Sequence, residues 1–163
     1  MAKGDIQPFE NSAAVKMDGS LKYVVAAGTV ASINAGEPVE KLAGANFVKQ
    51  LVTNAPTTTD RIVGIAVSVS TETVSVSGLV DVIPVSNGQI WMIAPKVLAS
   101  WNTQTLYNGN IGKRVLLDFT AGVFTILAAD AASQGCVVEY MDIARYPGMV
   151  AFSWSNVTDY RNV

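Results

Sequence analysis

The fold is decided by the stretch IAVSVSTETVSVSG, which spans residues 65–78. Small apolar side chains, most of them valine, alternate along it with serines on both sides of residues 71–73. A period of two is typical of a half-buried strand, and the Thr-Glu-Thr sequence lies where a hairpin would turn. The pattern therefore predicts an antiparallel hairpin with its valines on the core. The opposite face would carry Ser68, Ser70, Ser75 and Ser77.

Similar β-like segments lie on both sides of this hairpin. A turn is expected at residues 34–36, and a strand is expected to restart near residue 89 after an Asn-Gly turn signal. In residues 112–127 the pattern predicts a second hairpin, in which Phe119 lies opposite Phe124 and Asp118 faces solvent. Residues 94–104 give a modest helical signal. Eight or more short strands with almost no helix predict a mostly β fold, a single-domain antiparallel β-barrel or sandwich over residues 21–163.

Residues 1–20 show no sustained periodicity, and we interpret them as an extended N-terminal arm outside the core. Its apolar points are Ile6, Pro8 and Phe9. Chain termini are usually loose unless something holds them. The arm is therefore either disordered or docked on a neighbouring subunit.

Half of the residues are hydrophobic and 15% are charged, against about 25% charged residues in a typical soluble domain. The chain is therefore either a well-packed β domain or one that buries a second surface against partners. No apolar run approaches the ~18 residues that a membrane-spanning helix needs, and the start of the chain does not resemble a secretory signal. A net charge of −2 with scattered Lys and Arg predicts no direct binding to nucleic acid or to a membrane.

The chain contains no histidine and one cysteine, Cys136. This composition excludes Ser-His-Asp and Cys-His catalysis and the common zinc sites. Two carboxylates could still form a glycosidase site, but no pair is distinguished by its spacing. We therefore expect no catalytic residue, no metal ligand and no cofactor. Cys136 and Trp91 fit buried strand positions.

Aromatic side chains are the remaining candidates for recognition. Trp and Tyr are enriched where proteins contact partners, although they equally often cap a core. Both interpretations stay open for Trp101, Tyr107, Trp154 and Tyr160.

Three segments together resemble the small capsid decoration, or cement, proteins of tailed bacteriophages. They are GTVASINAGEPVEKL (28–42), DRIVGIAVSVSTETVSVSGLVDVIPVSNGQIWMI (60–93) and TLYNGNIGKRVLLDFTAGVFTIL (105–127). The resemblance rests on an ordered succession of strands and turns and not on a catalytic motif. It covers roughly residues 28–127, so the arm and the last 35 or so residues lie outside it.

The resemblance implies a β-rich protein, made in the cytoplasm of the host bacterium, that coats the outer surface of an expanded capsid. Such a protein would form a homo-oligomer, with a trimer favoured over a dimer, and would bridge neighbouring major capsid subunits. The serine face would then pack against a second subunit or the capsid, unless it is simply solvated. Two alternatives stay open: another virion component such as a tail, baseplate or head-fibre part, and a carbohydrate-binding module that uses surface aromatics.

Overall fold

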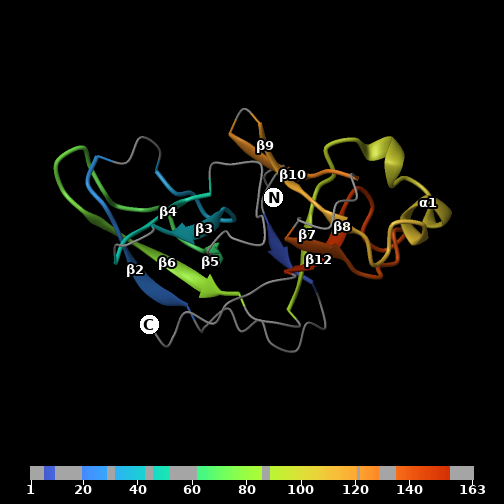
Figure 1. Cartoon of the computed structure of the whole chain (residues 1–163), viewed down its shortest axis with the longest axis horizontal. Coiled ribbons are helices and arrows are strands. Elements are labelled where there is room, and N and C mark those ends of the chain that lie inside the picture. The colour runs from blue at the N-terminus through green and yellow to red at the C-terminus, as the bar shows by residue number, and fades with distance from the viewer. Residues whose placement is uncertain are drawn as a thin grey trace.

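The computed structural model of the chain describes residues 6–9, 20–28, 32–42, 46–51, 62–85, 89–120, 122–128 and 135–154. Within these ranges the chain forms a closed five-stranded barrel, a five-stranded sheet, a two-stranded hairpin and a single short α-helix (Figure 1). The expected mostly β fold is therefore confirmed. The barrel lies at one end of the long axis of the molecule, and the sheet and α1 lie toward the other end.

The barrel strands neighbour one another in the order β2, β4, β3, β5, β6, and β6 returns to β2. Their bounds are β2 (Leu21–Val25), β3 (Pro38–Lys41), β4 (Val48–Gln50), β5 (Ile62–Ala66) and β6 (Gly78–Pro84). β2 and β4 pair in parallel, whereas the other neighbours are antiparallel. Closure leaves no edge strand with unpaired backbone groups. The interior is filled by small side chains, mostly branched: Val25, Ile33, Val39, Val48, Val63, Ala66, Val80 and Val82.

Two glycines allow the chain to bend and pack in the barrel. The expected turn at residues 34–36 is confirmed, and Gly36 adopts a φ of 86°, which favours a residue without a side chain. The backbone N–H of Asn34 donates to the carboxylate of Glu37 at 2.7 Å and closes this turn. Gly64 in β5 lies so close to the neighbouring strand that a Cβ there would overlap the carbonyl of Ile83.

The five-stranded sheet has the order β1, β7, β12, β11, β8, and each pair is antiparallel. Its strands are β1 (Gln7–Pro8), β7 (Ile90–Ile93), β8 (Arg114–Val115), β11 (Cys136–Val138) and β12 (Val150–Trp154). β9 (Leu117–Thr120) and β10 (Val123–Ile126) form the hairpin. A 3-10 helix, η1 (Leu98–Ser100), precedes α1 (Gln104–Asn108).

The larger of the two hydrophobic cores contains residues of both the barrel and the sheet. Ile62 and Ile83 contribute to it from the barrel, and Trp91 and Phe152 from the sheet. Cys136 and Trp91 are buried in this core, as expected. Apolar burial therefore connects the two halves of the molecule.

Ile6 belongs to this core and Phe9 packs against it, which corrects the expectation that the whole of residues 1–20 lies outside it. Ile6 is buried, and its backbone N–H donates to the carbonyl of Gly36 in the barrel at 3.0 Å. The N–H of Phe9 donates to the carbonyl of Ile90 in the sheet at 2.9 Å. A two-residue strand has too little periodicity to show in the sequence, so its pairing with β7 could not be predicted.

The hairpin predicted at residues 65–78 is only partly present. β5 and β6 do pair antiparallel, with Ile65 opposite Ile83. However, β5 ends at Ala66 and β6 begins at Gly78, so residues 67–77 form a loop and not two strand ends. Val67 is partly buried against the larger core, but the other three valines of the loop are not on a core: Val69, Val74 and Val76 are 56%, 88% and 63% exposed.

The hairpin of β9 and β10 has the predicted register. Phe119 lies opposite Phe124, with ring centroids 4.5 Å apart. Asp118, expected to face solvent, is instead buried. Lys96 lies 2.8 Å from its carboxylate, and the hydroxyl of Thr120 donates to the same oxygen at 2.7 Å. Burial acts to raise the pKa of Asp118, but these hydrogen bonds and the charge of Lys96 hold it below its ordinary value.

Candidate interaction surfaces

Residues 67–77, which we call the valine loop, are held in place by serine hydroxyls. The hydroxyl oxygen of Ser68 accepts a hydrogen bond from the backbone N–H of Asp81 at 2.9 Å. The hydroxyl oxygen of Ser70, which is buried, accepts one from the backbone N–H of Ile33 at 2.8 Å. Both serines therefore satisfy backbone donors of this chain. The uniform serine face predicted for this stretch does not exist.

The tip of the valine loop is stabilised in the same way. The hydroxyl oxygen of Ser77 accepts from the N–H of Ala27 at 3.3 Å, and that of Thr73 accepts from the N–H of Val76 at 3.0 Å. The carbonyl of Thr73 also accepts from the N–H of Gly28 at 3.2 Å. Ser75, the fourth predicted serine, is exposed. These hydrogen bonds tie the loop to the end of β2.

The loop bends because its backbone crosses directly over β6. A Cβ at Gly78 would overlap the backbone of Thr71 and Glu72. Thr71 fixes this crossing, since its N–H donates to the carbonyl of Leu79 at 3.1 Å and its hydroxyl oxygen accepts from the N–H of Leu79 at 3.0 Å. Alternating valine and serine therefore encode a folded loop here and not a continued hairpin.

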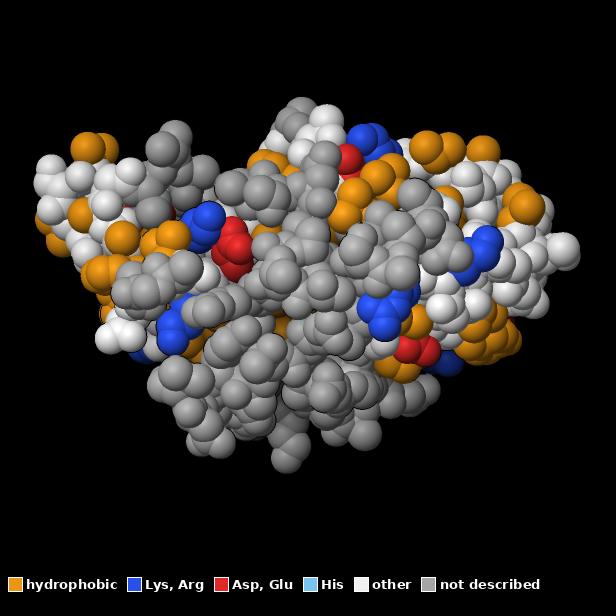
Figure 2. All heavy atoms as spheres, viewed as in Figure 1, with side chains coloured by type: hydrophobic (Ala, Val, Ile, Leu, Met, Phe, Trp, Pro, Cys, Tyr) orange, Lys and Arg blue, Asp and Glu red, His pale blue; other side chains and the backbone are white. Residues whose placement is uncertain are grey.

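Five aliphatic side chains on and beside this loop form an exposed group that we call the valine surface. Val24 of β2 and Leu79 of β6 are register partners and are 39% and 45% exposed. The exposed valines of the loop lie at the same end of the barrel, because hydrogen bonds join the loop to the ends of both strands. Figure 2 shows hydrophobic side chains gathered at this end of the molecule. The valine surface consists of Val24, Val69, Val74, Val76 and Leu79.

The valine surface has almost no free charge around it. Within residues 20–28 and 67–81 the charged side chains are Lys22, Glu72 and Asp81. Lys22 and Asp81 form an ion pair at 3.0 Å. Both carboxylate oxygens of Glu72 are buried, and neither has a hydrogen-bond partner in the part of the chain that the structure describes. Among these residues, the charged atoms that reach solvent are therefore those of the Lys22–Asp81 ion pair.

A second exposed apolar group lies around η1 and α1, and we call it the helical surface. The helix α1 is capped by Thr103, whose hydroxyl oxygen accepts from the N–H of Leu106 at 3.2 Å. In Figure 1 this region lies at the opposite end of the long axis from the valine loop. The sequence did not reveal this surface, because residues 94–104 follow neither a strand period nor a full helical period. The helical surface consists of Val97, Leu98, Leu106, Ile111 and Tyr140, all exposed.

The aromatic residues considered for recognition are mostly core residues. Trp101 and Tyr107 are buried and pack edge to face, with ring centroids 5.7 Å apart. Trp154 is buried and packs edge to face on Phe152, with ring centroids 5.2 Å apart. They therefore cap the core and offer no stacking platform to a ligand. Tyr160 lies outside the described residues.

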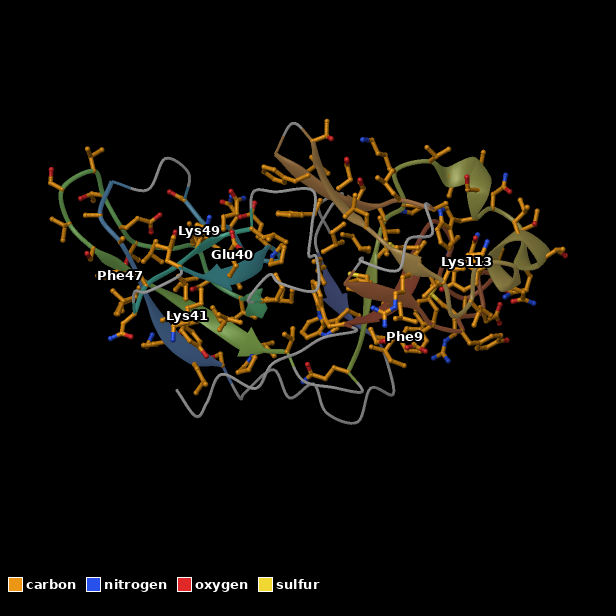
Figure 3. All side chains as sticks on the ribbon, viewed as in Figure 1. Phe9, Glu40, Lys41, Phe47, Lys49 and Lys113 are labelled. Carbon is orange, nitrogen blue, oxygen red and sulfur yellow. The ribbon has the colours of Figure 1, made fainter. Side chains whose placement is uncertain are left out.

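The apolar residues of the predicted arm also differ from a free docking segment. Ile6 is buried, and the half-buried ring of Phe9 packs on Tyr146 with centroids 5.3 Å apart. Pro8 pairs with Trp91 through the β1–β7 ladder. Figure 3 shows Phe9 beside the five-stranded sheet. Ile6 and Phe9 therefore serve the fold of the chain itself.

Buried charges in the barrel are paired across strands. Glu40 of β3 is buried, and its register partner Lys49 of β4 lies 3.0 Å away (Figure 3). Among the described residues, no three His, Cys, Asp or Glu side chains gather closely enough to hold a metal ion. Burial raises the pKa of the Cys136 thiol well above its ordinary value, which disfavours the reactive thiolate. No helix within the described ranges is long and apolar enough to span a membrane.

No family model, no curated protein and no solved structure matches the chain. Its function therefore has to be argued from the surfaces described above.

Proposed function

We propose that the chain is a structural virion protein that decorates the outer surface of a tailed-bacteriophage capsid and stabilises it by bridging major capsid subunits. The observation that carries this proposal is the presence of exposed apolar surfaces at the two ends of one elongated molecule. A bridging protein needs two separate contact surfaces. The valine surface and the helical surface supply them.

The distribution of side chains fits a binding role. The large aromatics are inside, most of the charges that the structure places in strands are paired, and aliphatic side chains remain at the two ends. Apolar side chains that gather on a protein surface are a recognised mark of sites that contact other proteins. On a shell the contacts repeat by symmetry, so weak individual contacts add up to tight attachment.

We assign the shell contact to the helical surface. Of its aliphatic side chains, Leu98 lies on the 3-10 helix and Leu106 on the capped helix α1. Trp101 and Tyr107 anchor these two elements to the core. A rigid, partly apolar projection can fit between capsid subunits without losing much conformational entropy. A carbohydrate-binding role is disfavoured, because Trp101 and Trp154 are buried.

Rebinding to shells tests this proposal. Capsids that lack the chain are mixed with purified protein, and the bound amount and the temperature of DNA release are measured. We expect saturable binding and a higher release temperature. Leu106→Lys should weaken binding by roughly 30-fold or more, because it places a charge in an apolar contact.

The control is Asn46→Lys, which adds the same charge at an exposed position between β3 and β4, in the barrel and outside both surfaces. It should bind like the unmodified chain. Absence of binding by the unmodified chain would refute the proposal, and equal binding by Leu106→Lys would refute the assignment of the helical surface.

A further inference from the structure

We propose that the valine surface is the interface at which copies of this chain associate with one another. Two copies joined there would each keep a helical surface free for the shell. The valine surface thus binds a second copy of the chain, and the helical surface binds the shell. The biological role of this interface rests on the proposed function.

The extent of the valine surface fits one protein–protein interface. The exposed fractions of its five residues add up to about three fully exposed aliphatic residues, on the order of 400 Å². A standard interface buries about 800 Å² on each partner, and a little more than half of that area is apolar. The valine surface therefore supplies nearly all the apolar area that one such interface requires.

Its neutrality favours a second copy of the same chain as the occupant. In an isologous interface each residue faces the same surface patch of its partner, so any free charge near the symmetry axis meets its own kind. Here Lys22 and Asp81 neutralise each other, and the carboxylate oxygens of Glu72 are turned away from solvent. Two copies of this surface therefore bring no unpaired, solvent-exposed charge of these segments into contact.

The loop is also held in one shape before association. Hydroxyl groups of Ser68, Ser70, Thr71, Thr73 and Ser77 all accept hydrogen bonds from backbone N–H groups. Valine has few accessible rotamers, so its burial costs little side-chain entropy. A preformed surface of this kind loses less free energy on association than a loop that must first become ordered.

The test uses the complete chain and measures its mass in solution by light scattering and native mass spectrometry at about 10 µM, where micromolar association is detectable. We expect the unmodified chain to have twice its 17.2 kDa monomer mass, as an isologous interface requires. The double variant Val74→Lys/Val76→Lys should associate at least about 30-fold more weakly. Because both valines are exposed, it should keep the circular dichroism spectrum and melting temperature of the unmodified chain.

The matched control is Val97→Lys on the helical surface, where the valine is 54% exposed. It should keep the full oligomer mass. In addition, an equimolar mixture of Val76→Lys and Val76→Glu should associate more strongly than either variant alone, because opposite charges then meet across the interface.

Two results would overturn the proposal: a monomeric unmodified chain at this concentration, or an unchanged mass for the folded double variant. Shell rebinding separates this failure from failure of the proposed function. A monomer that still binds shells contradicts the interface alone, and an oligomer that does not bind shells contradicts the decoration role alone.

Discussion

Replacement of Tyr107 by Phe removes one hydroxyl group from a ring that caps the larger core. This hydroxyl accepts a hydrogen bond from the backbone N–H of Ala151 at 2.9 Å and donates one to the carbonyl of Glu139 at 2.9 Å. The tyrosine is fully buried. The hydroxyl thus connects β12 with the chain just after β11, beside the backbone hydrogen bond that the N–H of Glu139 donates to the carbonyl of Ala151 at 2.9 Å.

The expected cost follows from the two backbone groups that the phenylalanine leaves unpaired. A buried donor or acceptor without a partner costs about 1–3 kcal/mol. The carbonyl has a second lone pair and relaxes more easily than the N–H, so we expect a total loss of roughly 2–4 kcal/mol in the free energy of unfolding. For a chain of this length, this corresponds to a fall in melting temperature of about 5–10 °C.

The assay is urea and thermal unfolding followed by tryptophan fluorescence and circular dichroism, with the denaturant m-value as a check on the unfolded state. Tyr140→Phe is the control, because Tyr140 is 63% exposed and should change stability by less than about 0.5 kcal/mol. If Tyr107→Phe also costs less than about 0.5 kcal/mol, the ring acts only as an apolar cap and our account of the hydroxyl is refuted.

Three further predictions concern stability. Gly78→Ala should destabilise the fold by about 2 kcal/mol or more in urea unfolding, because the valine loop must move off β6. The control Gly109→Ala, at a φ of −64°, should cost under about 0.5 kcal/mol. Equal losses in the two variants would contradict the crossing of the loop over β6. Lys96→Met should cost about 1–2 kcal/mol at pH 7, a value reduced for the partial exposure of Lys96. Because the pKa of Asp118 is lowered in the fold, the Lys96–Asp118 pair stabilises the protein above the ordinary carboxyl pKa and loses this effect as pH falls. If Lys96→Met is equally destabilising at acid pH, the pairing is contradicted. Burial raises the pKa of Tyr107 from 10.0 to about 12, with the charge of Glu139 also raising it and the hydrogen bond from Ala151 lowering it. As pH rises, the unfolded chain therefore loses the Tyr107 proton before the folded chain does, and about 2–3 kcal/mol of stability should be lost between pH 10 and pH 12. The Tyr107→Phe variant should not show this loss. Identical pH profiles of stability for the two proteins would contradict the prediction.

Local patterns predicted the parts of the fold that depend on neighbouring residues. The register of Phe119 with Phe124 follows from alternation across a short turn, and the bend at Gly36 follows from a glycine between two extended segments. In both cases the interacting residues are close in sequence. The period of two and the turn residues were sufficient to locate them.

The valine loop shows why the same pattern failed elsewhere. Alternation over residues 65–78 satisfied the rule for a strand, but Gly78 allows another backbone segment to cross β6. Ser70 then accepts a hydrogen bond from the backbone N–H of Ile33, which is far away in the sequence, and Ser68 accepts one from the N–H of Asp81 in β6. Periodicity contains no information about such partners, so the valines were assigned to the wrong side.

The candidate recognition residues were the least predictable part. A lone Trp or Tyr in a loop sequence gives no sign of its burial, and Trp101 and Tyr107 are buried against each other by a helical turn of only five residues. Ile6 joins the core through a two-residue strand. The exposed aliphatics of both surfaces became visible only when the core was identified, because apolar side chains inside and outside look alike in a sequence.

The central claim is decoration of a capsid, and the most direct measurement is quantitative mass spectrometry of purified particles from the native source. The quantity to determine is the number of copies of this chain per major shell subunit. Our account predicts a ratio near one or a simple fraction set by the capsid symmetry. A handful of copies per particle would indicate a tail or connector component, and absence from the particle would contradict the virion role altogether.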